Sequence, residues 1–335
     1  GNPDLKWETT TQKNIGLDAG VFRNKLDLSL DYFVKNTSDI LLPISLPSIV
    51  GNVLPTIVNA GEVSNKGIEA ALNFRDSGKS FRYGISANVA TVTNRVVKLH
   101  PNLPNIVGDV YRTQAGHALG SFYGYVFDGI YQNQNEINTY LHGTLNPADK
   151  PGDIKFKDLN GDGVINDNDR TFIGNPIPKM SYGLNLSADS HGFDMSVFFQ
   201  GVHGVDKYND VKQITDYDSR PFNHSVAVLN AWHGEGTSNT IPRTTFNDNG
   251  SSKKSSIFVE DASYLRLKNL EIGYSLGALR SFSRLGAENV RVYVSGQNLF
   301  TQTSYTGLDP ESTDIMDKGT YPQSRAFLFG VDWKL

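Results

Sequence analysis

The chain has 335 residues, a formal net charge of −4 and no cysteine, so neither disulfides nor thiolate chemistry contributes to it. It contains no basic block, which argues against a nucleic-acid partner. It also lacks a run of about 18 apolar residues that could form a transmembrane helix, whereas strands of a transmembrane barrel need only about 9–11 residues with every second one apolar.

The first hundred residues contain two predicted β-hairpins. Apolar and polar residues alternate over 15–21 and 26–34, and again over 68–75 and 81–89. A period of two over these lengths is typical of strands with one apolar and one polar face. The intervening segment 41–59 contains three prolines and is predicted to be a loop.

Two short helices are predicted in the polar stretches that follow. The first spans 133–141, with Asn133 as its N-cap. The second spans 225–232, inside a polar excursion over 204–256. An excursion of that length is unusual in a compact domain unless it is functional.

The second half of the chain resumes the strand pattern. The predicted strands are 182–188, 193–199, 264–276, 290–294 and 327–335. Within 264–276 the apolar positions change from odd to even numbers, which predicts a β-bulge near Lys268–Asn269.

About ten strands, joined alternately by short and long connections, predict an all-β fold. The favoured architecture is an antiparallel transmembrane β-barrel with short turns on one side and long extracellular loops, carrying short helices, on the other. The polar face of the strands would then line the lumen. The amino terminus has no features of a signal peptide and the first strand begins close to it, so we expect the chain to be a piece of a longer protein.

Residues 158–169 have the oxygen spacing of a twelve-residue calcium loop. Gly163 stands at position six, where the chain must turn sharply, and Asn166 at position nine could contribute through water. The predicted ligands, in loop order, are Asp158, Asn160, Asp162, Val164 through its carbonyl oxygen, and Asp169. The competing interpretation is a turn rich in Asp, Asn and Gly that binds nothing. We predict a structural Ca²⁺ that rigidifies a loop, not a sensor.

No motif in the sequence indicates an enzyme, because nucleophile, phosphate-binding and zinc signatures are all missing from it. The seven histidines are scattered and are interpreted as surface residues: His100, His117, His142, His191, His203, His224 and His233.

Aromatic residues are interpreted according to their position. Those in the long loops could stack on sugar rings or contact a partner protein, although packing within the loops is preferred: Tyr208, Tyr217, Phe222 and Trp232. Those in strands are interpreted as residues of an aromatic girdle or as lipid-facing residues, in preference to ligand sites: Tyr32, Phe74, Phe199 and Trp333.

Five long motifs, in the same order, resemble the carboxy-terminal part of the SusC/RagA-type TonB-dependent outer-membrane transporters. They are LKWETTTQKNIGLD from Leu5, NAGEVSNKGIE from Asn59, GDIKFKDLNGDGVINDNDRTFIGNPIPK from Gly152, DASYLRLKNLEIGYSL from Asp261 and VRVYVSGQNLFTQTSYTGLDPE from Val290. Together they are spread over nearly the whole chain.

The resemblance implies a 22-stranded barrel occluded by an amino-terminal plug. Residues 1–335 would form about ten carboxy-terminal strands of it, without the plug or the TonB box. The implied activity is import of glycans or peptides across the outer membrane of a Gram-negative bacterium. Implied partners are a SusD-like surface lipoprotein lid, TonB through the missing portion, the rest of the barrel and plug, and lipid or lipopolysaccharide. Two alternatives remain, namely a siderophore or cobalamin receptor and a structural or adhesive barrel.

Overall fold

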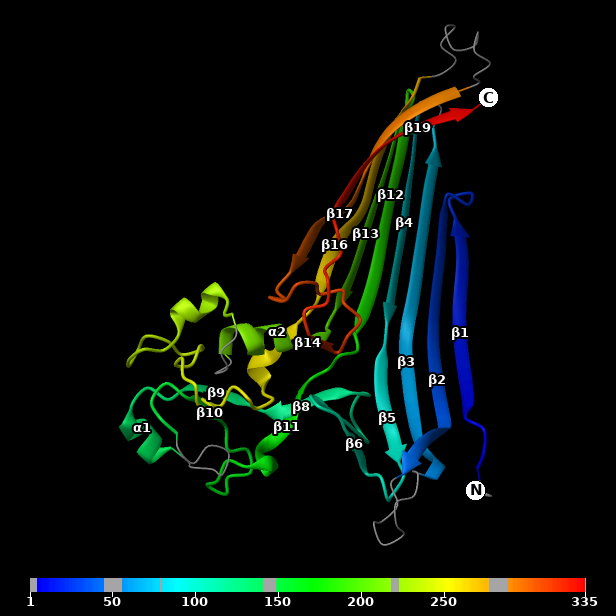
Figure 1. The fold of residues 1–335 in the computed structure, drawn as a ribbon. Helices are drawn as coiled ribbons and strands as arrows, with labels where there is room; N and C mark the ends of the chain where they lie inside the picture. The colour runs from blue at the N-terminus through cyan, green and yellow to red at the C-terminus, as the bar shows by residue number, and fades with distance from the viewer. Residues whose placement is uncertain are drawn as a thin grey trace.

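A ten-stranded antiparallel sheet forms the body of the molecule. The computed structural model describes residues 5–44, 56–78, 80–140, 149–217, 223–276 and 289–334. In this sheet the strands follow the order β1-β2-β3-β4-β12-β13-β16-β17-β19, and β5 pairs with β3 beside that path. Figure 1 shows a tall, twisted wall with the long connections gathered at one end. This arrangement confirms the predicted fold class, with the chain as part of a barrel.

Nine of the ten strands correspond to predicted ones and are mostly longer, whereas β5 was not predicted. Their bounds are β1 (Thr9–Val21), β2 (Leu26–Ile44), β3 (Thr56–Ser77), β4 (Phe81–Thr91), β5 (Thr93–Leu99), β12 (Met180–Ser190), β13 (Phe193–His203), β16 (Tyr264–Ser275), β17 (Asn289–Thr303) and β19 (Ala326–Lys334).

Cross-strand register gathers the apolar side chains on one face. A row of directly paired residues runs through Leu28, Leu72, Ala87, Leu184 and Phe199. Further rows of paired apolar residues lie beside it, and many of the large apolar side chains on this face are exposed. Because a contiguous apolar surface of this extent is rare on a water-soluble protein, we interpret the face as the one that contacts lipid.

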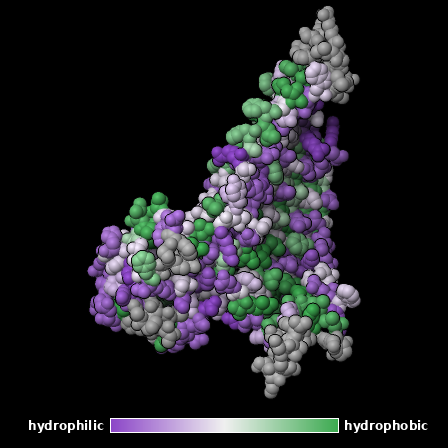
Figure 2. Space-filling view, viewed as in Figure 1, coloured by the Kyte–Doolittle hydropathy of each residue, from purple (hydrophilic) through white to green (hydrophobic). Residues whose placement is uncertain are grey.

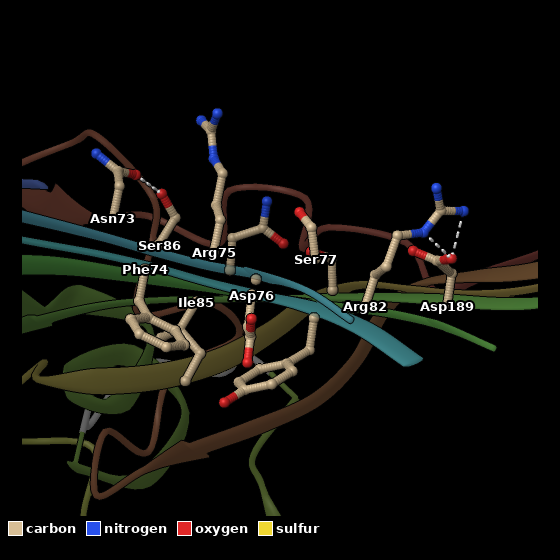
Figure 3. A pocket seen from close by; sticks show the side chains of 13 residues that line it. Asn73, Phe74, Arg75, Asp76, Ser77, Arg82, Ile85, Ser86 and Asp189 are labelled. Atoms are coloured by element: carbon tan, nitrogen blue, oxygen red, sulfur yellow. Dashed lines mark hydrogen bonds and ion pairs between the residues drawn. The ribbon is translucent and has the colours of Figure 1, made fainter. Parts of the chain in front are cut away.

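The opposite face of the sheet is polar. Figure 3 shows Asn73 and Arg82 pointing to one side of the strands, and Phe74 and Ile85 pointing to the other. Arg82 and Asp189 form an ion pair of 2.6 Å on the polar side. These side chains lie close to the short turns and line an open hollow of about 400 Å³. The alternation expected for a barrel lumen is therefore present.

The predicted β-bulge is confirmed. The pairing of β16 with β17 shifts between Leu267 and Asn269, and its pairing with β13 shifts between Phe198 and Phe199. The extra residue restores the phase, so that the apolar side chains on both sides of Lys268 remain on the same face.

The prediction that 41–59 is a loop was wrong at both ends. β2 continues through Ile44 and β3 begins at Thr56, while residues 45–55 lie outside the described part of the chain. Pro43 pairs with Ile57 inside this extension. The pairing of β1 with β2 extends no further than Ser38. Beyond that point no described strand pairs with this edge of β2, and a proline, which has no N–H group, is tolerated at such an edge.

Three long connections, 100–179, 204–263 and 304–325, form a second layer that we call the loop layer. Its elements are β6 (Asn105–Val107), β7 (Tyr111–Gln114), β8 (Ser121–Tyr125), β9 (Phe127–Ile130), α1 (Gln134–Thr139), β10 (Ile154–Phe156), η2 (Asp167–Asp169), β11 (Arg170–Gly174), β14 (Asp206–Asn209), α2 (Asp210–Lys212), η3 (Gln213–Tyr217), η4 (Val226–Asn230), η5 (Ser256–Phe258), β15 (Val259–Asp261) and β18 (Met316–Asp317).

The loop layer has a hydrophobic core of its own. Phe122, Tyr208 and Phe258 are fully buried in it. The ring centroid of Tyr208 lies 6.4 Å from that of Phe122 and 5.9 Å from that of Phe258. Its outer surface is mainly hydrophilic in Figure 2, with single hydrophobic residues among the polar ones. Among the residues that the structure describes, no helix is long and apolar enough to cross a membrane.

Both predicted helices are present in shortened form. The side chain of Asn133 accepts a hydrogen bond of 2.9 Å from the N–H of Glu136 and caps α1, as predicted. Within the segment 225–232 the structure has a five-residue 3₁₀ helix, Val226–Asn230, and the Ser225 hydroxyl caps it by accepting from the N–H of Ala227.

The lipid-facing assignment can be tested at two neighbouring residues of β12. We expect Leu184→Arg to lower the free energy of unfolding by about 2–4 kcal/mol, because its guanidinium would lie in hydrocarbon. Asn185→Arg, on the polar face, should change it by less than about 0.5 kcal/mol. Urea titration of the intact barrel in lipid vesicles measures both, and equal effects would contradict the assignment.

Candidate functional site

The loop layer is the candidate functional site. Functional residues of proteins are concentrated on loops that a rigid scaffold positions, and here all three long connections leave the same end of the sheet (Figure 1). Two features define its geometry, namely a buried network of charges and the predicted calcium loop.

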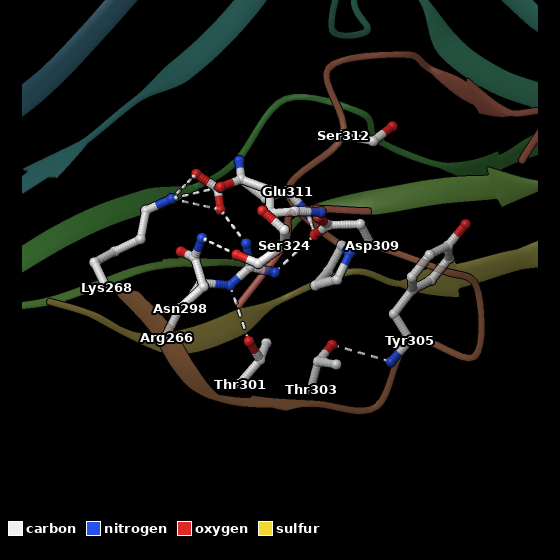
Figure 4. Close-up of polar contacts among 12 residues, drawn as sticks. Arg266, Lys268, Asn298, Thr301, Thr303, Tyr305, Asp309, Glu311, Ser312 and Ser324 are labelled. Atoms are coloured by element: carbon white, nitrogen blue, oxygen red, sulfur yellow. Dashed lines mark hydrogen bonds and ion pairs between the residues drawn. The ribbon is translucent and has the colours of Figure 1, made fainter. Parts of the chain in front are cut away.

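The buried charge network is centred on Arg266 of β16 (Figure 4). This side chain is 4% exposed, and its guanidinium contacts Asp309 Oδ1 at 2.7 Å and Glu311 Oε2 at 2.6 Å. Its Nε also donates to the Thr301 hydroxyl at 2.9 Å. Lys268 Nζ contacts Glu311 Oε1 at 2.8 Å. The network thereby ties the connection between β17 and β19 to the wall of the sheet.

The carboxyl group of Asp309 is charged within this network. Burial raises its pKa, but hydrogen bonds from the N–H groups of Gln323 and Glu311, and from Arg266, lower the pKa by more. A buried ion pair of this kind contributes little more to folding stability than an apolar pair in its place would. Loss of one partner, however, leaves the other charge buried and uncompensated. Arg266 and Asp309 therefore depend on one another.

A second buried cation holds the same connection. Lys207 of β14 donates hydrogen bonds to the carbonyl oxygens of Pro310, at 3.1 Å, and Ser312, at 2.6 Å. Burial lowers the pKa of Lys207, while the negative charge of Asp317 opposes that shift. The ammonium also lies 5.7 Å from the centre of the Tyr305 ring. The chain from 304 to 325 is thus fixed from two strands.

The predicted calcium loop is anchored at both ends. Asp158 Oδ2 accepts from the N–H of Gly163 at 3.0 Å, and that glycine has the positive φ of 84° that a sharp turn requires. Partial burial raises the pKa of Asp158, but backbone hydrogen bonds, led by that from Gly163, lower the pKa by more. Asp169 is buried and accepts from the N–H groups of Leu159, at 2.9 Å, and Asn166, at 2.7 Å.

The middle of this loop is bonded within itself. Asp162 accepts from the N–H of Val164 at 2.8 Å and from the side-chain amide of Asn160 at 2.8 Å. The carbonyl oxygen of Val164 accepts from the side chain of Asn166 at 3.3 Å. In the described part of the chain no three Asp, Glu, His or Cys side chains converge as a metal-binding group. The three aspartates predicted as ligands, Asp158, Asp162 and Asp169, therefore do not form a carboxylate cluster, although each oxygen keeps a second lone pair.

The loop aromatics pack as preferred from the sequence. Tyr208 and Tyr217 are buried, and Trp232 packs against the same core. Phe222 lies outside the described residues. Of the histidines, His142 lies outside them too, and the other six are exposed or half-buried, in agreement with surface positions.

The four strand aromatics all occupy positions of the apolar face. Tyr32 pairs with Ile15 and Ile68, and Phe199 pairs with Leu184. Phe74 lies opposite Ile85, and Trp333 lies opposite Val290. Their prediction as lipid-facing residues agrees with this register.

The charge network was not identified from the sequence. A signal for it existed, because Arg266 and Lys268 alternate with leucines and must therefore share the polar face of a strand. Their partners Asp309 and Glu311 stand more than 40 residues further on, in a segment without regular periodicity.

Comparisons with known proteins agree on one family. Residues 1–299 match the family model described as "TonB dependent receptor-like, beta-barrel". The TonB-dependent receptor P3 of Formosa agariphila is 37% identical over 99% of this chain and 35% of its own length. The TonB-dependent receptor SusC of Bacteroides thetaiotaomicron is 26% identical over 98% of this chain and 32% of its own length.

A solved structure has the same fold. The structure of the RagAB peptide transporter matches 99% of this chain and 36% of the matched chain, with a TM-score of 0.83 and 26% sequence identity. The chain thus spans about a third of the length of the relatives that it matches.

The charge network can be tested by removing its central cation. We expect Arg266→Ala to destabilise the loop layer by about 3–5 kcal/mol, because Asp309 and Glu311 would be left without their partner. Limited proteolysis at 304–325 and equilibrium unfolding of the intact protein measure this. Arg325→Ala, an exposed residue of the same connection, is the matched control and should cost less than about 0.5 kcal/mol.

The same network should weaken in acid. The folded-state pKa of Asp309 lies below its unfolded value of about 3.9, so its contribution is complete well above that value. It is lost as the pH falls through the folded-state pKa. Protection of 304–325 against proteolysis should therefore fall as acid titration passes through that pKa, and protection that did not depend on pH anywhere in the acid range would contradict a contribution from the Asp309 charge.

Proposed function

Since the chain belongs to the TonB-dependent receptor-like β-barrel family, as a SusC/RagA-type outer-membrane receptor, we propose that it forms part of an energised nutrient importer. It would supply wall strands and extracellular loops. The observation that carries this proposal is a single sheet with an apolar outer face, a polar inner face and a fixed loop layer at one end. No bond chemistry is assigned to it.

The remaining barrel and the plug would come from the rest of the protein. Within the described residues, β1 and β19 each have a strand partner on one side only. An open edge in lipid leaves backbone N–H and C=O groups without hydrogen bonds, which only closure of the barrel removes. TonB would act through that remaining portion, at the periplasmic side of the Gram-negative outer membrane.

Oligosaccharides or peptides are the proposed substrates, in line with the similarity to SusC and to a peptide transporter. A SusD-like surface lipoprotein is the proposed lid. Its docking is supported by large apolar side chains that the loop layer exposes in the connection 204–263. Val226 is 82% exposed, Leu229 83% and Phe246 89%.

A structural Ca²⁺ is proposed for residues 158–169. The donor set fits a hard cation, because Asp158 and Asp169 are fixed carboxylates at loop positions one and twelve. Asn160, Asp162 and the Val164 carbonyl would complete the set once their hydrogen bonds within the loop open. When bound, the ion would hold this loop rigid and take no part in transport.

The importer and its lid can be tested together. We expect cells producing the whole protein to take up a labelled oligosaccharide or peptide pool when TonB is present and not when it is deleted. The double variant Leu229→Asp/Phe246→Asp should lose the co-purifying lipoprotein, because charges would replace its apolar contacts. Asn247→Asp adds a charge at an exposed neighbour and should retain it.

Two outcomes would count against these proposals. Uptake that does not require TonB would indicate a structural or adhesive barrel. Retention of the lipoprotein by the double variant would place the lid contact elsewhere on the loops.

The calcium proposal is tested by metal titration of the intact protein. Extracellular calcium modules typically have dissociation constants of about 10⁻⁴ M. We choose 5 mM calcium, which is roughly 50 times that constant, and expect it to stabilise the loop by about 2 kcal/mol. Chelation should increase proteolysis at 158–169. Asp158→Ala should abolish the calcium effect, whereas Asn168→Ala, inside the loop but not among the ligands, should preserve it. Calorimetry without calcium uptake would refute the proposal.

A further inference from the structure

The three long connections meet around one hollow in the loop layer. Its volume is about 620 Å³, within the range of small-molecule sites. Asp109 comes from the first connection, Asp210, Gln213 and Lys254 from the second, and Lys318 from the third. The hollow therefore exists only when all three connections are packed together.

Lys254 brings unused hydrogen-bonding capacity into this hollow. Its Nζ lies 3.3 Å from Gln213 Oε1, and 3.9 Å from both Asp109 Oδ2 and Asp210 Oδ1. A separation of 3.9 Å is too long for a hydrogen bond. Gln213 is the one hydrogen-bond acceptor of this ammonium among the described residues. An ammonium has three donors, so two of them are available to a ligand beside the two carboxylates.

Two neighbours of Lys254, Gln213 and Tyr208, are held in place by buried contacts. Gln213 is buried, accepts from the Tyr208 hydroxyl at 2.7 Å and donates to the carbonyl oxygen of Ser251 at 2.6 Å. The ring of Tyr208 lies 5.3 Å below the ammonium. Gln213 and Tyr208 thus position the ammonium at the hollow, whereas the side chain of Asp109 is 67% exposed and open to a ligand.

The chemistry of the hollow favours hydroxyl groups. One hydroxyl can donate to a carboxylate and accept from an ammonium through the same oxygen, and so fills the gap beside Lys254. Ile214 and Met316 are the main residues of the lining that could contact the apolar side chains of a peptide. Its three aspartates outnumber its two lysines, which disfavours acidic saccharides.

We propose that this hollow is a binding subsite for a neutral, hydroxyl-rich saccharide unit, with Lys254, Asp109 and Asp210 as its hydrogen-bonding groups. The proposal rests on the import function proposed above and narrows its substrate class from glycans or peptides to neutral glycans.

Calorimetry on the intact transporter with its lid, in a detergent without sugar groups, tests the subsite. The probes are neutral hexasaccharides (malto-, cello-, xylo- and arabino-), an oligogalacturonate and a tryptic peptide digest. We expect at least one neutral hexasaccharide to bind. Lys254→Met should weaken its binding at least tenfold, and Asp210→Asn should also weaken it. Lys253→Met, the adjacent lysine outside the lining, should leave binding unchanged, with the melting temperature of each variant as folding control.

The possible failures are distinguishable. Saccharide binding that neither Lys254→Met nor Asp210→Asn weakens would overturn the site but leave the import function standing. Binding of peptides alone, of the oligogalacturonate alone or of no saccharide at all would overturn the substrate class. If saccharide binds as expected while uptake proves independent of TonB, the import function fails and the subsite stands.

Discussion

The hydrogen-bonded ladder between neighbouring strands is the interaction on which the rest of the structure depends. Hydrocarbon offers no water to a backbone N–H or C=O, so a transmembrane sheet must satisfy these groups from strand to strand. The ladder also fixes the register, and the register decides which side chains meet lipid. The unbroken apolar row from Leu28 to Phe199 is a product of that register, and so is the polar face behind it. The loop layer then inherits its position from the strand ends.

At the strand ends, buried ion pairs and hydrogen bonds from cations fix the position of the chain. The connection between β17 and β19 is long and mostly polar, and apolar packing alone would hold it poorly. Arg266 and Lys207 compensate by placing buried cations against carboxylates and carbonyl oxygens of that connection. Because each buried charge requires its partner, the connection has one favourable position and many costly ones. A hydrogen bond between Tyr208 and Gln213 likewise fixes the two residues that contact the ammonium of Lys254 in the hollow.

Periodicity allowed most of the sheet to be predicted from the sequence, because the alternation of a half-exposed strand is a local property. Even the bulge near Lys268 could be located from the change of phase alone. The strand extension through Pro43 could not, since it depends on where the neighbouring strand β1 ends. The short strands of the loop layer, such as Ile154–Phe156, carry too few residues for a period to be recognised. The ion pair of Arg266 with Asp309 escaped prediction because spatial pairing across 43 positions leaves no local pattern.

The bulge in β16 has a consequence for how the protein assembles. A slip of this strand by one residue relative to its neighbours would turn every side chain to the opposite face. Arg266 and Lys268 would then leave the polar face, and Asp309 and Glu311 would lose their partners. The ion pairs of the two cations thus favour the native register of β16 over a register shifted by one residue. Insertion or deletion of a single residue between Tyr264 and Ser275 would be tolerated far less well than most substitutions there.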